Sequence, residues 1–213
     1  MKKVIVTLLI IAVAVVLILA AFVKPYNNMV QKDEVCSQAW ANVENVYQRR
    51  ADLIPNLVKT VQGAAQYEKS TLEAVINARA KATSVQVDPS NLTEENIAKF
   101  QAAQDQLSSA LSRLLVTIEK YPDLKANQNF LELQAQLEGT ENRIAVERNK
   151  FNETVNDYNS YIRKFPNNII AGLFNFDKKG YFKAAADFAG ARNCHQEGRV
   201  PFLERPSGWN LCA

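Results

Sequence analysis

The sequence predicts an all-α protein, with a single N-terminal transmembrane helix followed by an elongated antiparallel bundle of three to four long helices. Gly and Pro each occur only seven times in 213 residues, so turn signals are rare. Apolar residues recur every three or four positions through most of the chain. A nearly continuous apolar run occupies residues 4–23. We therefore expect an anchor at 1–23, a helical bundle at 24–190 and an irregular tail at 191–213.

The apolar run follows two lysines and is interrupted only by Thr7. A helix of about 20 apolar residues is long enough to cross the hydrocarbon core of a bilayer. A cleaved signal peptide is the competing interpretation. We favour an uncleaved anchor because the run is longer than a signal peptide requires and no small-x-small cleavage site follows it. Lys2 and Lys3 before the run slightly favour an N-terminus on the cytoplasmic side.

A helical pattern begins near Met29, after a break expected at residues 25–28, and runs past Pro55 to about Ala80. Its apolar stripe comprises Val35, Ala39, Val43, Val46 and Leu53, then Leu57, Val61, Leu72, Val75 and Ile76, with a gap at Arg49 and Arg50. A proline inside a helix costs about 3 kcal/mol. Asp52 can cap a new helix that has Pro55 in its first turn. The sequence therefore predicts a sharp kink or a fresh helix start at Asp52.

Two further long helices follow. Residues 83–90 break the pattern, and Asn91 and Glu94 have the spacing of a capping box with Asn91 at the cap. The next helix ends at Tyr121, because the residue before a proline is disfavoured in a helix. Its apolar positions are Ile97, Phe100, Leu107, Leu111, Leu114, Leu115 and Ile118. The last helix, from about 129 to 165, has Phe130, Leu133, Leu137, Ile144, Phe151, Val155, Tyr158 and Ile162 on one face.

The residues that could perform chemistry are sparse. The three cysteines have no metal-ligand spacing; Cys36 is expected to be an inert core residue, and Cys194 could pair with Cys212 in an oxidising compartment. The only histidine, His195, lies in the tail beside Cys194. No phosphate-binding loop, nucleophile elbow or zinc motif occurs. We therefore expect no catalytic residues, no cofactor and no metal. The net charge of +3 gives no reason to expect nucleic acid binding.

A polar stripe lies next to the apolar face of the last helix. It comprises Glu141, Arg148, Asn152, Asn156 and Asn159, and the expected partners across the bundle are Arg50, Asp52 and Asn56. Such a network would fix the register of helices that could otherwise slide. A solvated face is the equally weighted alternative.

Four aromatic residues follow the last helix: Phe174, Phe176, Tyr181 and Phe182. They either cover one end of the bundle as core, which we favour, or form an exposed patch for a partner or a bilayer.

Several motifs together resemble the LemA family over about residues 24–190. They are RRADLIPNLV at 49–58, YP at 121–122, LEGTENRI at 137–144 and the stretch from Arg148 to Phe165-Pro166. The resemblance implies a bacterial membrane-anchored helical bundle with no established enzymatic activity. Some members of the family are linked to intracellular membrane formation, which suggests scaffolding. The resemblance also implies a short extracellular N-terminus and a cytoplasmic body, the opposite of the orientation that the lysines favour.

The sequence leads to two functional hypotheses. The first is a non-enzymatic, membrane-anchored scaffold that self-associates and supports membrane organisation or assembly. The alternative is a regulatory adaptor for another membrane protein, such as a protease, a transporter or a sensor kinase. The expected partners are the lipid bilayer, further copies of the chain and a second membrane protein. The expected location is the bacterial inner membrane, crossed once. A hydrolase ranks below both, because no nucleophile–base pair is evident.

Overall fold

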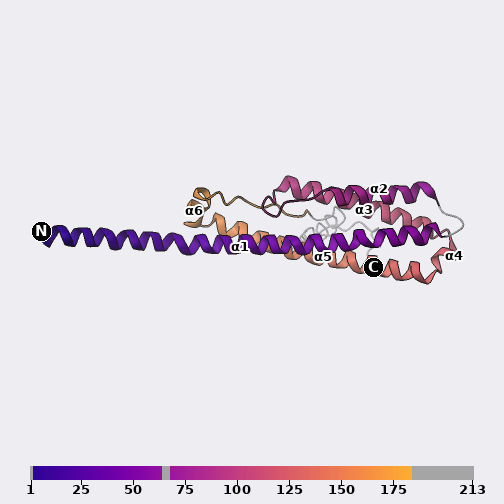
Figure 1. Ribbon diagram of the computed structural model, residues 1–213, viewed down its shortest axis with the longest axis horizontal. Helices are drawn as coiled ribbons and strands as arrows, with labels where there is room; N and C mark the ends of the chain where they lie inside the picture. Colours follow the sequence, from indigo (N-terminus) through magenta and orange to yellow (C-terminus); the bar gives the residue numbers. More distant parts are fainter. Residues whose placement is uncertain (1, 64–67, 184–213) are drawn as a thin grey trace, which may run out of the picture. The chain divides into compact units, whose positions relative to one another are not determined.

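The computed structural model describes residues 2–63 and 68–183, apart from the side chains of residues 2, 3, 7 and 14–21. By its contacts the chain divides into one unit at Met1–Phe182 and a second at Lys183–Ala213. The predicted tail at 191–213, with Cys194, His195 and Cys212, lies outside the described residues. The regular elements of the described part are the helices α1 (Lys2–Gln62), α2 (Lys69–Ser84), α3 (Glu94–Ile118), α4 (Pro122–Lys125), α5 (Gln128–Arg163) and α6 (Asn167–Leu173) (Figure 1).

The two longest helices, α1 and α5, pack against each other in antiparallel orientation. Lys32 of α1 pairs with Asp157 of α5, and Arg50 pairs with Glu141, so sequence numbers rise along one helix as they fall along the other. Helices α2 and α3 form the second pair. They are joined by the short connection at residues 85–93 and are also antiparallel. The predicted antiparallel helical bundle is thus confirmed for these four long helices.

Helix ends follow local chemistry. Thr93 caps α3, since its Oγ1 accepts from the Asn96 N–H at 3.3 Å. The prediction that Asn91 is the cap was wrong: Asn91 lies outside the helix, and its carbonyl accepts from the Asn96 side chain instead. Asn127 caps α5 by accepting from the Phe130 N–H at 3.2 Å. Pro122 occupies the first turn of α4, where its missing N–H leaves no helical hydrogen bond unmade.

Helix α1 runs through both Pro25 and Pro55, so the break predicted at residues 25–28 and the fresh helix start predicted at Asp52 are absent. Asp52 is no helix cap; its carboxylate accepts from Gln48 on the same helix at 2.8 Å. The carbonyl that Pro55 would leave without a partner is that of Ala51. Arg79 of α2 supplies the missing donor through Nε, at 2.8 Å. A neighbouring helix therefore replaces the hydrogen bond that the proline removes. The break that does occur lies after Gln62, next to Gly63, and was not predicted.

The core consists of two apolar clusters. One gathers around Trp40, Phe100, Phe151 and Phe182, and the other around Leu57, Leu107, Leu114 and Phe130. All eight apolar positions predicted for the last helix are buried. The predicted stripe of α1 was right in part. Val43, Leu57 and Val61 are buried, but Val35 is 44% exposed. The buried residues Met29, Cys36, Trp40, Tyr47 and Ile54 were not part of the predicted stripe.

Before the bundle, α1 carries apolar side chains that are largely exposed. Val4, Ile5, Leu8, Leu9 and Ile10 are each about 60% exposed. Within the described part of the chain, no helix meets the combined length and hydropathy needed to cross a bilayer. The side chains of residues 14–21, inside the predicted span, are not among those that the structure describes. The transmembrane segment therefore stays a prediction from sequence.

Candidate functional site

The most extensive buried polar contact centres on Arg50 of α1, whose side chain is only 1% exposed. Nη1 donates to Glu141 Oε1 of α5 at 2.5 Å and to Ser108 Oγ of α3 at 2.8 Å. Nη2 donates to the side-chain oxygen of Gln104 at 2.8 Å and to its carbonyl at 3.3 Å. The planar guanidinium suits such a site because it offers several donors in fixed directions. One side chain thus joins three helices.

Gln104 extends this contact to a fourth helix. It is 6% exposed, and its amide donates to the Ala82 carbonyl near the end of α2 at 3.3 Å. The Tyr47 ring lies 5.0 Å from the Arg50 guanidinium and adds a cation–π contact. Burial raises the pKa of Tyr47, while the charges of Arg148 and Arg50 oppose the shift. The hydroxyl is therefore neutral at physiological pH and leaves the Arg50 charge to be balanced by Glu141.

A second polar contact holds residues 177–182, an extended segment after α6. Asn159 of α5 donates to the Lys179 carbonyl at 2.8 Å and accepts from the Lys179 N–H at 3.0 Å. Asn152, two turns earlier, forms the same pair of bonds with the backbone of Phe182, at 3.0 and 2.9 Å. Side-chain amides can do this because they carry both a donor and an acceptor. The two asparagines act as the hydrogen-bonding edge of a neighbouring strand.

The opposite side of the same segment lies against the start of α3. Gly180 N–H donates to the Leu92 carbonyl at 2.8 Å. A Cβ at Gly180 would lie 2.6 Å from the Glu94 Cα, closer than real side chains approach a backbone. Glycine is therefore required here by the close approach of two backbones.

Lys179 is the second buried cation of the described residues, with a side chain that is 7% exposed. It pairs with Asp33 of α1 at 2.8 Å and lies over the Tyr158 ring. Cys36 lies nearby, and burial raises the pKa of its thiol to about 11, an effect that the positive charge of Lys179 partly opposes. Burial also raises the pKa of Tyr158, whose hydroxyl donates to the Asp177 carbonyl. The Cys36 thiol and the Tyr158 hydroxyl therefore keep their protons at neutral pH.

The residues of the predicted polar network separate into three groups. Arg50 and Glu141 come together, while Asn152 and Asn159 contact the 177–182 segment rather than α1. Arg148 lies over the Phe182 ring, 4.8 Å from its centroid. Asp52, Asn56 and Asn156 are exposed, and Asp52 bonds within its own helix. The expected contact of Asp52 with the stripe on α5 is therefore not made.

The four aromatic residues after α5 divide between the two expected roles. Phe182 is 4% exposed and stacks on Trp40 in the core, with ring centroids 5.8 Å apart. Phe174 and Tyr181 are 51% and 38% exposed. Phe176 is intermediate in exposure, and its ring and that of Phe174 both contact Tyr26 of α1.

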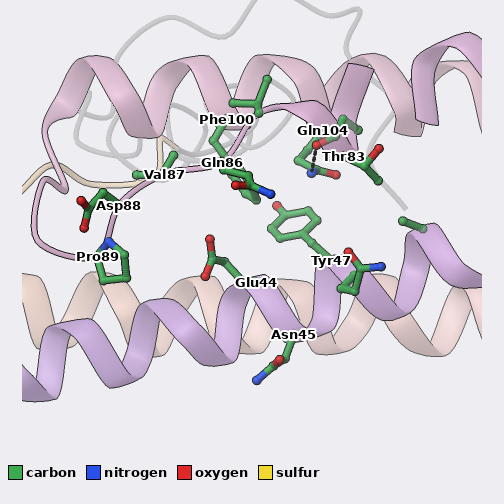
Figure 2. A pocket seen from close by; sticks show the side chains of 14 residues that line it. Glu44, Asn45, Tyr47, Thr83, Gln86, Val87, Asp88, Pro89, Phe100 and Gln104 are labelled. Carbon is green, nitrogen blue, oxygen red and sulfur yellow. Dashed lines mark hydrogen bonds between the residues drawn. The ribbon is translucent and has the colours of Figure 1, made fainter. Parts of the chain in front are cut away.

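A groove of about 610 Å³ adjoins the Arg50 contact, between α1, α3 and the connection at residues 85–89. Figure 2 shows Glu44 and Tyr47 reaching into it from α1, whereas Asn45 points away. Burial raises the pKa of Glu44, and the indole of Trp40 opposes the shift. The groove thus combines a half-buried carboxylate with the amides of Gln86 and Gln104. No group of three metal-ligating side chains is found among the described residues.

The sequence profile described as the LemA family matches residues 39–195, about three quarters of the chain. The chain belongs to the LemA family. It is 27% identical over 187 residues to magnetosome protein MamQ 2 of Paramagnetospirillum magneticum. The aligned region covers 80% of this chain and 69% of that protein. It is 28% identical to magnetosome protein MamQ of Magnetospirillum gryphiswaldense, over 81% of this chain and 72% of that protein. It is 22% identical to protein LemA of Metamycoplasma hominis, over 75% of this chain and 69% of that protein.

The match to the LemA family contains both polar contacts, from Arg50 to the 177–182 segment. Sequence reasoning did not identify Gln104, Ser108, Arg79 or Lys179 as members of these contacts. The gap in the apolar stripe at Arg50 was a usable signal, because this arginine stands at a position that the helical period assigns to the buried face. Lys179 carries no such periodic signal, since it lies in an irregular segment.

Proposed function

We propose that this LemA-family chain is a non-enzymatic, membrane-anchored helical scaffold of the bacterial inner membrane that self-associates and supports membrane organisation or assembly. The observation that carries the proposal is the continuity of α1 from Lys2 to Gln62. This helix connects the exposed apolar side chains before Lys24 directly to the bundle, so a position in the bilayer would be transmitted to the bundle without a flexible linker.

The polar contacts support a structural role. Nη1 and Nη2 of Arg50 bond Glu141, Ser108 and Gln104, whereas its buried Nε has no partner among the described residues. The amides of Asn152 and Asn159 bond backbone groups. Buried polar groups that satisfy one another specify a unique helix register. In this proposal they hold four helices and one extended segment in a fixed arrangement and transform no substrate.

Self-association is the second element of the proposal. Its support is a set of apolar side chains outside the core, of which Val116 on α3 is 66% exposed and Val146 on α5 is 50% exposed. Two relatives bear the name magnetosome protein, which is compatible with a role at an assembly. Association through these positions would bring copies side by side in the membrane.

Mass measurement of the full chain in lipid nanodiscs tests this element. A scaffold should give a mass of two or more copies per disc at a lipid-to-protein ratio where an unrelated single-span protein gives one. The paired Val116→Glu and Val146→Glu variant should shift the mass toward one copy, because a charge at an apolar contact is costly to bury. A single copy at every protein concentration would contradict self-association.

The groove beside Glu44 favours the alternative, a regulatory adaptor for another membrane protein. A half-buried carboxylate with neighbouring amides suits a partner segment that presents a basic side chain. Proximity labelling in cells distinguishes the two proposals: one dominant foreign partner, lost in Glu44→Gln, favours the adaptor, whereas mostly self-contacts favour the scaffold. Glu153→Gln, on the exposed surface of α5, is the matched control.

A further inference from the structure

An exposed apolar surface lies around the short helix α6. It comprises Phe165 (82% exposed), Ile169 (56%), Leu173 (68%) and Phe174 (51%), and we call it the α6 patch. The opposite side of the same helix, with Ile170 and Ala171, is buried in the bundle core. A helix that is apolar on both faces is expected to bury both of them, one in the core and the other in a second apolar environment. We propose that the α6 patch inserts into the lipid headgroup boundary of the membrane, beside the point where α1 leaves the bilayer.

The position of the patch along α1 supports this occupant. The Phe174 ring lies 4.8 Å from the ring of Tyr26, and the Phe176 ring lies 5.7 Å from it. Tyr26 follows the end of the apolar run at Val23 by three residues, a rise of about 4.5 Å. The headgroup layer adds about 5–7 Å on each side of the hydrocarbon core. These three rings therefore lie at the depth where aromatic side chains are enriched in membrane proteins.

Charge around the patch agrees with an anionic lipid surface. Arg163, Lys164 and Lys178 are exposed and flank the patch in sequence, against the single exposed carboxylate of Asp177 in the 163–178 stretch. Lys24, which is also exposed, follows the apolar run of α1. Each basic residue near an anionic bilayer contributes favourable electrostatic energy. A protein partner would not require the patch to adjoin the apolar run, whereas a bilayer does. The inference rests on the proposed anchoring of α1 and adds a second contact to it.

Site-specific photo-crosslinking tests the proposal in the full chain. A benzophenone amino acid is placed at Leu173, at Ile10 in the apolar run, or at Val116, an apolar residue of similar exposure on α3. Each protein is reconstituted in vesicles of phosphatidylcholine and phosphatidylglycerol and irradiated, and lipid adducts are measured by mass spectrometry. Circular dichroism verifies that every variant is folded.

We expect lipid adducts at Leu173 and Ile10, with at least roughly tenfold less at Val116. In this proposal only the first two positions lie in the membrane, and the preference of an apolar side chain for the bilayer corresponds to such a factor. Adducts at Ile10 without adducts at Leu173 would overturn the α6 proposal and leave the anchor intact. Crosslinks from Leu173 to a second copy of the chain would also overturn it. Absence of lipid adducts at Ile10 would refute the anchor on which the inference rests, and the α6 proposal with it.

Discussion

Arg79 of α2 donates a 2.8 Å hydrogen bond to the carbonyl of Ala51 in α1. That carbonyl stands four residues before Pro55, so the helix itself can offer it no donor. The contact explains how α1 continues through a proline that would otherwise favour a helix end. It also couples α2 to the middle of α1.

The first prediction concerns this coupling. Replacing Arg79 with methionine should lower the free energy of unfolding by about 1 kcal/mol, because a half-buried carbonyl loses its donor. In a Pro55→Ala background the loss should nearly vanish, since the new N–H at position 55 can bond the Ala51 carbonyl. Thermal unfolding followed by circular dichroism in mild detergent measures both effects. Arg143→Met, on the exposed side of α5, is the control. Equal losses in both backgrounds would contradict the explanation.

The second prediction concerns Arg50. Arg50→Met should cost about 2–4 kcal/mol, somewhat less than for a fully buried ion pair because Glu141 is 48% exposed and can be hydrated. For a domain of this size the melting temperature should fall by roughly 4–16 °C. Arg50→Lys should recover only part of this loss, because an ammonium cannot reproduce the planar set of donors. Arg49→Met, at the adjacent exposed position, should change stability by less than about 0.5 kcal/mol. Similar effects of the two methionine variants would argue against a central role for Arg50.

Two glycines provide a third, matched prediction. Gly180→Ala should destabilise the fold by about 1–3 kcal/mol, because the new Cβ would overlap the backbone of Glu94. Gly139→Ala, inside α5 with nothing within 4 Å of the added Cβ, should stabilise it by about 0.8–1 kcal/mol. Hydrogen exchange at Lys179 and Phe182 should accelerate only in Gly180→Ala. Stabilisation by both substitutions would show that the 177–182 segment is not held against α3.

The fourth prediction concerns the pH dependence of Cys36. Burial raises the pKa of its thiol to about 11, so the folded state favours the protonated form. The thiolate that reacts is therefore scarce at pH 8, and the contribution of this group to stability is lost as the pH rises through 9 to 11. In a Cys194→Ser, Cys212→Ser variant, a thiol reagent should modify Cys36 at least about 100-fold more slowly in the native state than in urea. Rapid native modification at pH 8 would show that the site is open.

Features of the helices that depend on nearby residues could be predicted from the sequence, whereas features that depend on distant residues could not. The apolar face of α5 was predicted in full because its period is maintained by large aliphatic and aromatic residues. The stripe of α1 was predicted only in part: Val43 and Leu57 are buried as expected, but the buried face also includes Trp40 and Tyr47, which the stripe omitted. The fresh helix start at Asp52 was wrongly predicted, because Arg79, the donor that compensates for Pro55, lies 28 residues from Ala51 in sequence.

The polar contacts could be predicted from the sequence only in part. The helical spacing of Asn152 and Asn159 marked a polar stripe, but their partners lie in a segment without periodicity, so Lys179 and Phe182 could not be assigned from sequence. Gly180 carries a requirement that only the approach of the Leu92–Glu94 backbone reveals.

The central claim is that the apolar start of α1 anchors the bundle in a membrane. Alkaline carbonate extraction of membranes that contain the full chain, or a variant lacking residues 4–23, measures this directly. We expect the full chain to stay with the membrane pellet and the shortened chain to be released with its helical circular dichroism preserved. Release of the full chain into the carbonate supernatant would show that residues 4–23 do not anchor the bundle.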